Sequence, residues 1–252
     1  MRLALWQGKS PAADLEEATQ EVERATAAAA MMGADVVVFP EIWMQGYNQP
    51  DLLARLLTRD NPVFDRLEKA ACQSGCSIVV GYAEDAEGRS YNSALCLFPD
   101  GRPRMNYRKL QLYGEREKAL YQPGDAYVQF TIAGRSAAML ICYDIEFAPH
   151  VAKLAGLGVE IILVPTANMH PFTHVVRHTV PAMAANHGVT IVYANYCGTE
   201  GDLSYVGGSL IAGPHGEILA QAGESGPCLL VAEVPERDAL RLSTQAQDLR
   251  TI

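Results

Sequence analysis

Three residues that could act as base, cation and nucleophile follow three strand-like segments. The stretch M-L-I-C-Y-D-I-E-F at 139–147 places Cys142 directly behind an apolar run, while V-V-V-F-P leads into Glu41 and Tyr-Arg leads into Lys109. A carboxylate can take a thiol proton, the thiolate can attack a carbonyl carbon, and an ammonium can stabilise the resulting oxyanion. Functional groups of α/β proteins gather beyond the carboxyl ends of strands. The three residue types therefore indicate acyl-transfer chemistry without a serine–histidine pair.

Each of these residues also has a purely structural interpretation. In this interpretation Cys142 is a small apolar side chain at the end of a core strand. Glu41 is a carboxylate that faces solvent or pairs with an arginine, and Lys109 is a solvated lysine at a strand end. The residue types alone leave both interpretations open. Their joint occurrence at three strand ends favours the chemical one.

The composition is that of a globular protein with an acidic surface. Of the 252 residues, 49% are hydrophobic and 19% are charged, and the formal net charge is −9. The chain holds five lysines, which argues against nucleic-acid binding, because phosphate contacts require clustered lysine and arginine. No apolar run approaches the ~20 residues of a membrane-spanning helix. Neither nucleic acid nor a membrane is therefore expected as a partner.

The cysteines are expected to be reduced thiols in a cytoplasmic protein. The chain opens on a strand-like segment, M-R-L-A-L-W-Q-G, without the charged and apolar regions of a secretion signal. Cys72 and Cys76 lack a second pair of ligands at zinc-binding spacing, so we predict no metal site there. The six cysteines are at positions 72, 76, 96, 142, 197 and 228.

Short apolar runs predict strands that are buried on both faces of a sheet. These runs are Leu3–Trp6, Val36–Phe39, Ser77–Gly81, Ala137–Ile141, Ile161–Val164 and Thr190–Ala194. Two further pairs of runs, separated by turn residues, predict hairpins. The pairs are Ala94–Phe98 with Arg104–Lys109, and Ser209–Ala212 with Ile218–Ala222.

Helical periodicity separates several of these runs. Asp14 is the expected N-cap of a first helix that stops at Gly33, and a second helix over 63–71 is expected to end at Gly75. Two more helices are expected over 150–157 and 173–186. The order of elements predicts an α/β fold in which two mixed sheets pack face to face with helices outside, a four-layer α-β-β-α sandwich. No linker divides the chain, so we expect one domain over 1–252.

Three segments closely resemble the signature segments of the nitrilase superfamily of carbon–nitrogen hydrolases. They are F-P-E at 39–41, Y-R-K-L at 107–110 and L-I-C-Y-D at 140–144. Further matches are Y-N-S-A at 91–94, P-G-D at 123–125, V-P-T-A-N at 164–168 and D-L-R at 248–250. The resemblance covers essentially the whole chain. It implies the same four-layer fold, and catalysis without a metal or other cofactor.

The resemblance also implies a role for each matching residue. Glu41 resembles the family's general base, Lys109 its oxyanion lysine and Cys142 its nucleophile. In the implied reaction Cys142 attacks an amide carbon, ammonia leaves, and water activated by Glu41 hydrolyses the thioester. The backbone N–H of Tyr143 would complete the oxyanion hole.

The family uses a second glutamate, and Glu117 matches it. Glu117 lies eight residues after Lys109 and seven before Gly124 of the P-G-D segment, whereas Glu115 fits neither spacing. Asn168, at the end of V-P-T-A-N, is a further candidate for substrate contact. Other candidate pocket residues follow Glu41: Trp43 and Tyr47 are expected either to wall the acyl site or to cap the core.

The segments around the nucleophile narrow the expected substrate. L-I-C-Y-D-I-E-F, V-P-T-A-N-M and V-Y-A-N-Y-C-G are most similar to the R-stereoselective amidases and 5-aminopentanamidases (δ-aminovaleramidases). N-carbamoyl-D-amino-acid hydrolases hold a substrate carboxylate with arginines where this chain has Ile145 and Glu146. We therefore hypothesise a small primary aliphatic amide, neutral or amine-bearing, with Glu146 attracting the amine. The structural alternative is that Glu146 pairs with Arg177 or another arginine.

Other functions within and outside the superfamily remain open. They are an N-carbamoyl-amine hydrolase, an ω-amidase or deaminated-glutathione-type hydrolase, a nitrilase, and a scaffold that has lost catalysis. True nitrilases usually carry long C-terminal extensions, and this chain stops shortly after D-L-R, so an amidase is expected instead. The resemblance also implies a homodimer or higher homo-oligomer.

The segment after T-A-N-M departs from the family pattern. It contains His170, Pro171 and His174, and we expect this loop to line the pocket. His170, His174 and His178 have the spacing of one helical face, but Pro171 interrupts the first turn. No metal site is therefore predicted at these histidines.

Overall fold

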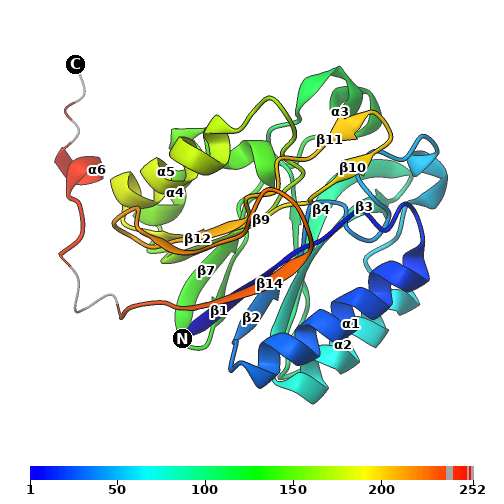
Figure 1. The fold of residues 1–252 in the computed structure, drawn as a ribbon, viewed down its shortest axis with the longest axis horizontal. Coiled ribbons are helices and arrows are strands. Elements are labelled where there is room, and N and C mark those ends of the chain that lie inside the picture. The colour runs from blue at the N-terminus through cyan, green and yellow to red at the C-terminus, as the bar shows by residue number, and fades with distance from the viewer. Residues whose placement is uncertain (237–240, 249, 251–252) are drawn as a thin grey trace.

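Two six-stranded sheets form the centre of the protein. The computed structural model describes residues 1–236, 241–248 and 250. The first sheet has the order β14-β1-β2-β3-β4-β5 and the second the order β13-β12-β9-β8-β7-β6. The sheets pack face to face, with β1 against β9 and β3 against β8. Helices cover the outer face of each sheet, which gives four layers (Figure 1).

Each sheet is built around three parallel strands, β1-β2-β3 in the first and β7-β8-β9 in the second, and antiparallel strands extend both. The strands of the first sheet are β1 (Arg2–Gln7), β2 (Val36–Val38), β3 (Ser77–Ala86), β4 (Arg89–Leu97), β5 (Met105–Arg108) and β14 (Cys228–Glu233). Those of the second are β6 (Gln129–Ile132), β7 (Arg135–Met139), β8 (Ile161–Pro165), β9 (Thr190–Ala194), β12 (Leu210–Ala212) and β13 (Ile218–Gln221). A small hairpin pairs β10 (Thr199–Glu200) with β11 (Leu203–Ser204).

The helices complete the layers. Helices α1 (Leu15–Met31) and α2 (Pro62–Ser74) cover the first sheet, and α4 (Ala148–Gly156) and α5 (Val180–His187) cover the second (Figure 1). The remaining turns and helices are a 3-10 turn at Leu52–Arg55, α3 (Gly114–Leu120), a 3-10 turn at Cys142–Glu146, a π-helical turn at Val175–Thr179 and α6 (Gln245–Asp248). No helix in the described ranges is long and apolar enough to cross a membrane.

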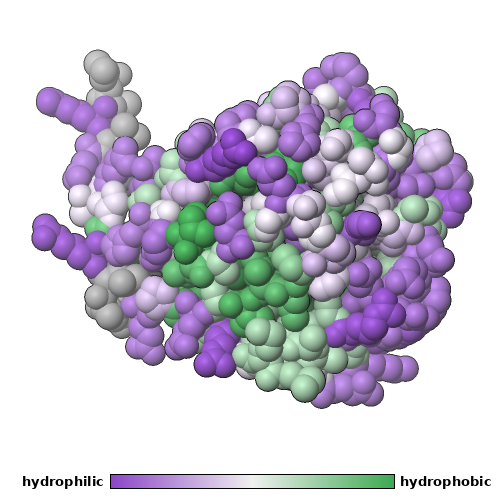
Figure 2. All heavy atoms as spheres, in the orientation of Figure 1, coloured by the Kyte–Doolittle hydropathy of each residue, from purple (hydrophilic) through white to green (hydrophobic). Residues whose placement is uncertain are grey.

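The alternation of side chains along the strands divides the core. Leu3 and Leu5 of β1 belong to the cluster between the two sheets, whereas Ala4 belongs to the cluster beneath α1 and α2. This is the period of two that a strand imposes. On the face shown in Figure 2, an apolar area lies over β14, and polar and charged side chains surround it. Residues Cys228 to Val231 of β14 are partly exposed.

The predicted four-layer sandwich is confirmed, as are several helix ends. Asp14 is the N-cap of α1 and accepts a hydrogen bond from the backbone N–H of Glu17 at 3.0 Å. Gly75 and Gly188 end α2 and α5 in the left-handed conformation. The helix predicted over 173–186 begins as a π-helical turn before α5.

Some elements differ from the prediction for identifiable physical reasons. β3 runs on to Ala86 and forms a hairpin with β4, and Glu84, in the part of β3 beyond the predicted strand, is buried and pairs with Arg108 at 2.8 Å. The helix α3 was not predicted, since its one buried residue, Glu117, gives no apolar periodicity. β6 and β14 were also not predicted. The D-L-R match includes Leu249, which lies outside the described residues.

Candidate active site

Glu41 lies immediately beyond β2 and is fully buried. Its Oε1 accepts hydrogen bonds from Nδ2 of Asn92 at 2.6 Å and from Nζ of Lys109 at 2.7 Å. Its backbone is held by the second sheet, since its N–H donates to the carbonyl of Thr166 at 3.3 Å and its carbonyl accepts from Oη of Tyr196 at 2.8 Å. Both sheets therefore position this carboxylate.

The two oxygens of Glu41 have different surroundings. Oε2 is buried and has no hydrogen-bond partner among the described residues. Burial raises the pKa of Glu41 to about 7, although the charge of Lys109 acts in the opposite direction. A carboxyl group with this pKa can both accept and release a proton near neutral pH, as a general base requires.

Lys109 lies just beyond β5 and is also buried. Its ammonium donates to Oε1 of Glu41 and to Oε1 of Glu117, both at 2.7 Å. Burial lowers the pKa of Lys109, but the charges of Glu117 and Glu41 more than offset this and the net shift is upward. The lysine is therefore a fixed cation. The P-G-D segment supports it, because the N–H of Gly124 donates to the carbonyl of Lys109 at 2.8 Å.

Glu117 projects from α3 to the other side of Lys109. Its Oε1 accepts from Oη of Tyr47 at 2.7 Å and its Oε2 accepts from the N–H of Tyr113 at 2.8 Å. Glu115 is highly exposed instead and pairs with Lys118 at 3.1 Å. The structure thus brings Glu117, the glutamate that the resemblance singled out, to the lysine.

Cys142 begins the 3-10 turn that follows β7. Its φ of 45° lies in the left-handed region, which costs a residue with a Cβ about 1–3 kcal/mol and is frequent at functional sites. Burial and the charge of Glu41 raise the pKa of the Cys142 thiol, while Lys109, the Thr166 hydroxyl and the Ala167 N–H lower it. The thiol is therefore protonated at rest, and a base has to take its proton before it can attack.

A cavity of about 250 Å³ opens onto Cys142. Its lining residues are Tyr47, Tyr113, Cys142, Tyr143, Glu146, Ala167, Asn168, Met169, Phe172 and His174. Tyr113 makes edge-to-face contacts with Tyr143 and Phe172, with ring centroids 5.4 and 5.9 Å apart. The prediction that the loop after T-A-N-M lines the pocket is confirmed, because Phe172 and His174 belong to this loop.

The structure separates the predicted pocket residues. Tyr47 lines the cavity, whereas Trp43 lies in the core, where it stacks on Tyr196 with ring centroids 5.6 Å apart. Of the two interpretations of Trp43, the structural one therefore holds. Asn168 lines the cavity and shapes its loop, since Nδ2 donates to the carbonyl of Phe172 at 3.1 Å.

Glu146 lines the cavity, and its suggested pairing with Arg177 does not occur. Arg177 pairs with Glu224 at 3.0 Å. Burial raises the pKa of Glu146, while His174 and Lys109 act in the opposite direction. His170 and His178 are exposed, and the described part of the chain contains no group of three or more His, Cys, Asp or Glu side chains placed to hold a metal ion.

Asn92 and Tyr113 were not predicted as site residues, and Phe172 was predicted only as part of the loop after T-A-N-M. Asn92 belongs to the quoted Y-N-S-A match, so the sequence contained a signal for it. Tyr113 reaches the site because α3 begins directly after it, and α3 itself was not predicted.

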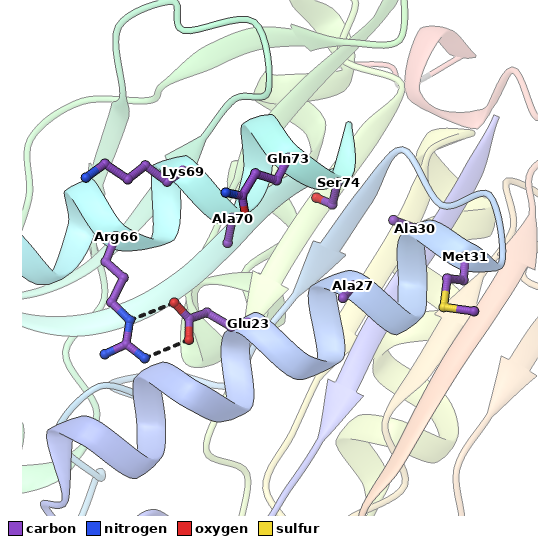
Figure 3. A pocket seen from close by; sticks show the side chains of 9 residues that line it. All are labelled: Glu23, Ala27, Ala30, Met31, Arg66, Lys69, Ala70, Gln73 and Ser74. Atoms are coloured by element: carbon purple, nitrogen blue, oxygen red, sulfur yellow. Dashed lines mark hydrogen bonds and ion pairs between the residues drawn. The ribbon is translucent and has the colours of Figure 1, made fainter.

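A larger cavity of about 630 Å³ lies between α1 and α2, away from these residues (Figure 3). Arg66 and Glu23 face one another across it and form two hydrogen bonds of 2.7 Å (Figure 3). Its lining includes no thiol and no hydroxyl beside a base. The smaller cavity at Cys142 is therefore the candidate active site.

Comparison with known proteins identifies the family of the chain. Residues 2–240 match the model of the carbon-nitrogen hydrolase family. The chain therefore belongs to the carbon–nitrogen hydrolase family, as the resemblance to the nitrilase superfamily predicted.

Individual relatives cover most of the chain. It is 36% identical to a hydrolase encoded in the pqqF 5′ region of Pseudomonas protegens, over 88% of this chain and 79% of the relative. It is 32% identical to an (R)-stereoselective amidase of a Pseudomonas species, over 85% of this chain and 77% of that protein. A solved structure of an amidase from Nesterenkonia sp. AN1 superposes with a TM-score of 0.89 at 32% identity, over 99% of this chain and 96% of that one. In a variant of that amidase, acrylamide has added to the active-site cysteine.

Proposed function

We propose that this protein is a cysteine-dependent amidase that hydrolyses a small primary aliphatic amide to a carboxylic acid and ammonia through a thioester. One observation carries the proposal. A buried lysine bridges two buried glutamates, Glu41 and Glu117, beside a cavity that exposes Cys142. A scaffold or binding protein has no need to bury three charges at this cost.

The first half of the reaction forms the thioester. Oε2 of Glu41 takes the proton of Cys142, and the thiolate attacks the amide carbon. The negative charge that develops on the amide oxygen is stabilised by the ammonium of Lys109 and the N–H of Tyr143. Protonated Glu41 then gives its proton to the leaving amine, the carbon–nitrogen bond breaks, and ammonia departs.

The second half hydrolyses the thioester. Water enters the position that ammonia has left and gives a proton to Glu41 as it attacks the carbonyl carbon. The tetrahedral intermediate expels the thiolate, which recovers its proton from Glu41. Glu117 keeps Lys109 charged and in place throughout, and its own oxygens are held by Tyr47 and Tyr113.

The cavity supports a small substrate that is neutral or carries an amine. Its volume of about 250 Å³ and its aromatic lining suit a short aliphatic acyl group. Glu146 is the acidic residue of the lining and forms no ion pair with a basic side chain in the described ranges. A carboxylate on the substrate would be repelled there, whereas an ammonium would be attracted.

The test is ammonia release from a panel of primary amides, with Cys142→Ala beside the wild type. The panel contains short aliphatic amides, 5-aminopentanamide, amino-acid amides, ω-amide acids and matching nitriles, together with carbamoyl amines. Turnover of neutral or amino-amides that disappears in C142A is the expected result. Turnover restricted to nitriles, carbamoyl amines or ω-amide acids would overturn the proposed substrate. No turnover of any compound in the panel would overturn the proposed activity.

A further inference from the structure

Asp144 carries a buried carboxylate with three hydrogen-bond donors around it. Its Oδ2 accepts from Oη of Tyr107 at 2.7 Å and from the N–H of Ile141 at 3.0 Å, and its Oδ1 accepts from the N–H of Gln111 at 2.7 Å. The side chain is fully buried, and no Lys or Arg among the described residues forms an ion pair with it. Burial raises the pKa of Asp144, while the Ile141 N–H and Lys109 act in the opposite direction.

These donors lie on the two segments that carry the lysine and the nucleophile. Tyr107 and Gln111 flank Lys109, two residues away on each side. Ile141 directly precedes Cys142, and the N–H of Asp144 returns a hydrogen bond to the Ile141 carbonyl at 3.0 Å. A single carboxylate thus joins the end of β5 in one sheet to the turn after β7 in the other.

This junction also spans the strained residue. Cys142 has a φ of 45° between Ile141 and Asp144. A backbone conformation of this kind persists only when the surrounding contacts over-determine it. The reciprocal bonds between Ile141 and Asp144 close the turn around Cys142 and supply such contacts.

We infer that Asp144 is a positioning residue that fixes the Cys142 turn against the Lys109 segment, so that the thiolate and the oxyanion-binding ammonium keep one relative placement. Asp144 does not touch the substrate. It acts through the backbone on both sides of the catalytic pair. The inference rests on the proposed roles of Cys142 and Lys109 in thiol chemistry.

The substitution Asp144→Asn tests the inference with little change in shape. An asparagine offers one acceptor oxygen and one amino group, so either the Ile141 N–H or the Gln111 N–H must face a second donor. Either way, one of the two segments is released from the junction. We expect kcat to fall at least tenfold with KM changed less than threefold, because the acyl cavity is untouched.

A second readout follows the thiol without any turnover. The rate at which methyl vinyl sulfone, an alkylating agent without an amide group, modifies Cys142 is measured against pH, with peptide mapping to separate Cys142 from the exposed Cys72. In D144N the pH profile is expected to move upward, because displacement of Lys109 removes a charge that lowers the pKa of both Glu41 and the Cys142 thiol. A role confined to general stability would leave this profile unchanged in the folded variant.

Tyr82→Phe is the matched control. It removes another buried hydroxyl of the first sheet, which donates to Oδ1 of Asn106 at 2.9 Å. We expect Y82F to keep the wild-type kcat and alkylation profile. D144N with a wild-type kcat or profile would overturn the inference.

If D144N does not fold, Asp144→Glu provides the test, because it keeps the charge but displaces the acceptor oxygens by one methylene. It is expected to show the same loss of kcat and the same profile shift. Failure of both variants to fold would assign the carboxylate to the fold as a whole and also overturn the inference. Alkylation needs no substrate. If the wild type hydrolyses no amide, the proposed function is overturned, but the alkylation profiles of D144N and the wild type still decide the role of Asp144.

Discussion

The side-chain amide of Asn92 donates to Oε1 of Glu41 at 2.6 Å, the same oxygen that accepts from Lys109 at 2.7 Å. The backbone carbonyl of Asn92 also accepts from the N–H of Lys109 at 2.8 Å. One fully buried residue thus fixes both the carboxylate and the lysine. With Oε1 engaged twice, Oε2 is the oxygen left for proton transfer.

Asn92→Ala is expected to lower kcat while KM changes little. A hydrogen bond to a charged group contributes about 1.5–3 kcal/mol, which corresponds to about 10- to 160-fold in rate if it acts in the transition state. Steady-state kinetics on the best amide of the panel measures the effect. The control is Ser93→Ala, which removes a neighbouring buried hydrogen bond, from Oγ of Ser93 to Oε2 of Glu84 at 2.6 Å. Equal kcat values for N92A and the wild type would contradict the role of Asn92.

The reactivity of Cys142 is expected to rise with pH through about 7. Glu41, whose pKa burial raises to about 7, is protonated below that pH and cannot take the thiol proton. Above it, the carboxylate is available. Alkylation of Cys142 by methyl vinyl sulfone, followed from pH 5 to pH 9, should therefore show an acidic limb centred near this value. The limb should be absent in Glu41→Gln, and its persistence there would assign the titration to another group.

The same pKa shift predicts how stability changes with pH. The pKa of Glu41 is about 7 in the folded protein against an ordinary value of 4.5. Between these values the folded state holds more protons than the unfolded state, so this group's contribution to stability falls as pH rises. We expect the free energy of unfolding of the wild type, relative to E41Q, to decrease from pH 4.5 to pH 7. Urea titrations at the two pH values measure it, and an unchanged or increasing difference would refute the shift.

Much of the fold and the catalytic set could be predicted because local signals coincide with tertiary roles. The segments before Glu41 and Cys142 are continuous apolar runs, whereas Lys109 follows the more polar strand β5 and was identified together with the Y-R-K-L match. Glu84 and Glu117 could not be placed by the same logic. Each is buried against a basic residue of another segment, Glu84 against Arg108 at 2.8 Å and Glu117 against Lys109 at 2.7 Å. Hydrophobic periodicity detects buried apolar residues, so it does not predict elements whose buried residues are charged.

The position of Trp43 shows a different limit of sequence reasoning. It lies two residues after Glu41, but the intervening Ile42 has a φ of 50°. The chain turns there, and the Trp43 ring points into the core, where its Nε1 donates to the carbonyl of Ala18 at 3.3 Å. Tyr47, farther along the sequence, reaches Glu117 instead. Proximity in sequence therefore did not predict which aromatic residue meets the site.

Glu146→Gln is expected to discriminate between substrates. Glu146 lines the cavity and forms no ion pair with a Lys or Arg of the described residues, and Arg177 pairs with Glu224 instead. Loss of its charge should lower kcat/KM for an amino-amide about fivefold or more, while the matched neutral amide of equal length changes less than twofold. Glu224→Gln, on the partner of Arg177, is the control and should affect neither substrate. Equal losses on both amides in E146Q would remove the basis for an ammonium preference.

Gly81→Ala is expected to disrupt the site through the backbone. Gly81 of β3 lies beneath the turn that carries Glu41, and a Cβ there would lie 2.6 Å from the carbonyl oxygen of Pro40 and 2.7 Å from Cα of Glu41. These are backbone atoms, so the turn would have to shift and carry the carboxylate away from Lys109. We expect the free energy of unfolding to fall by about 1–3 kcal/mol, as for overpacking of a core. We also expect kcat to fall by more than the loss of folded protein explains.

The control for G81A is Gly156→Ala. Gly156 ends α4, and a Cβ there would meet no atom within 4 Å. Alanine is favoured over glycine in helices by up to about 1 kcal/mol, so G156A should be as stable as the wild type or more so, with unchanged kcat. Thermal unfolding and active-site alkylation, measured on the same samples, separate folded fraction from activity. A G81A protein with wild-type stability and kcat would show that the Glu41 turn can move without harm, and would weaken the requirement for its fixed position.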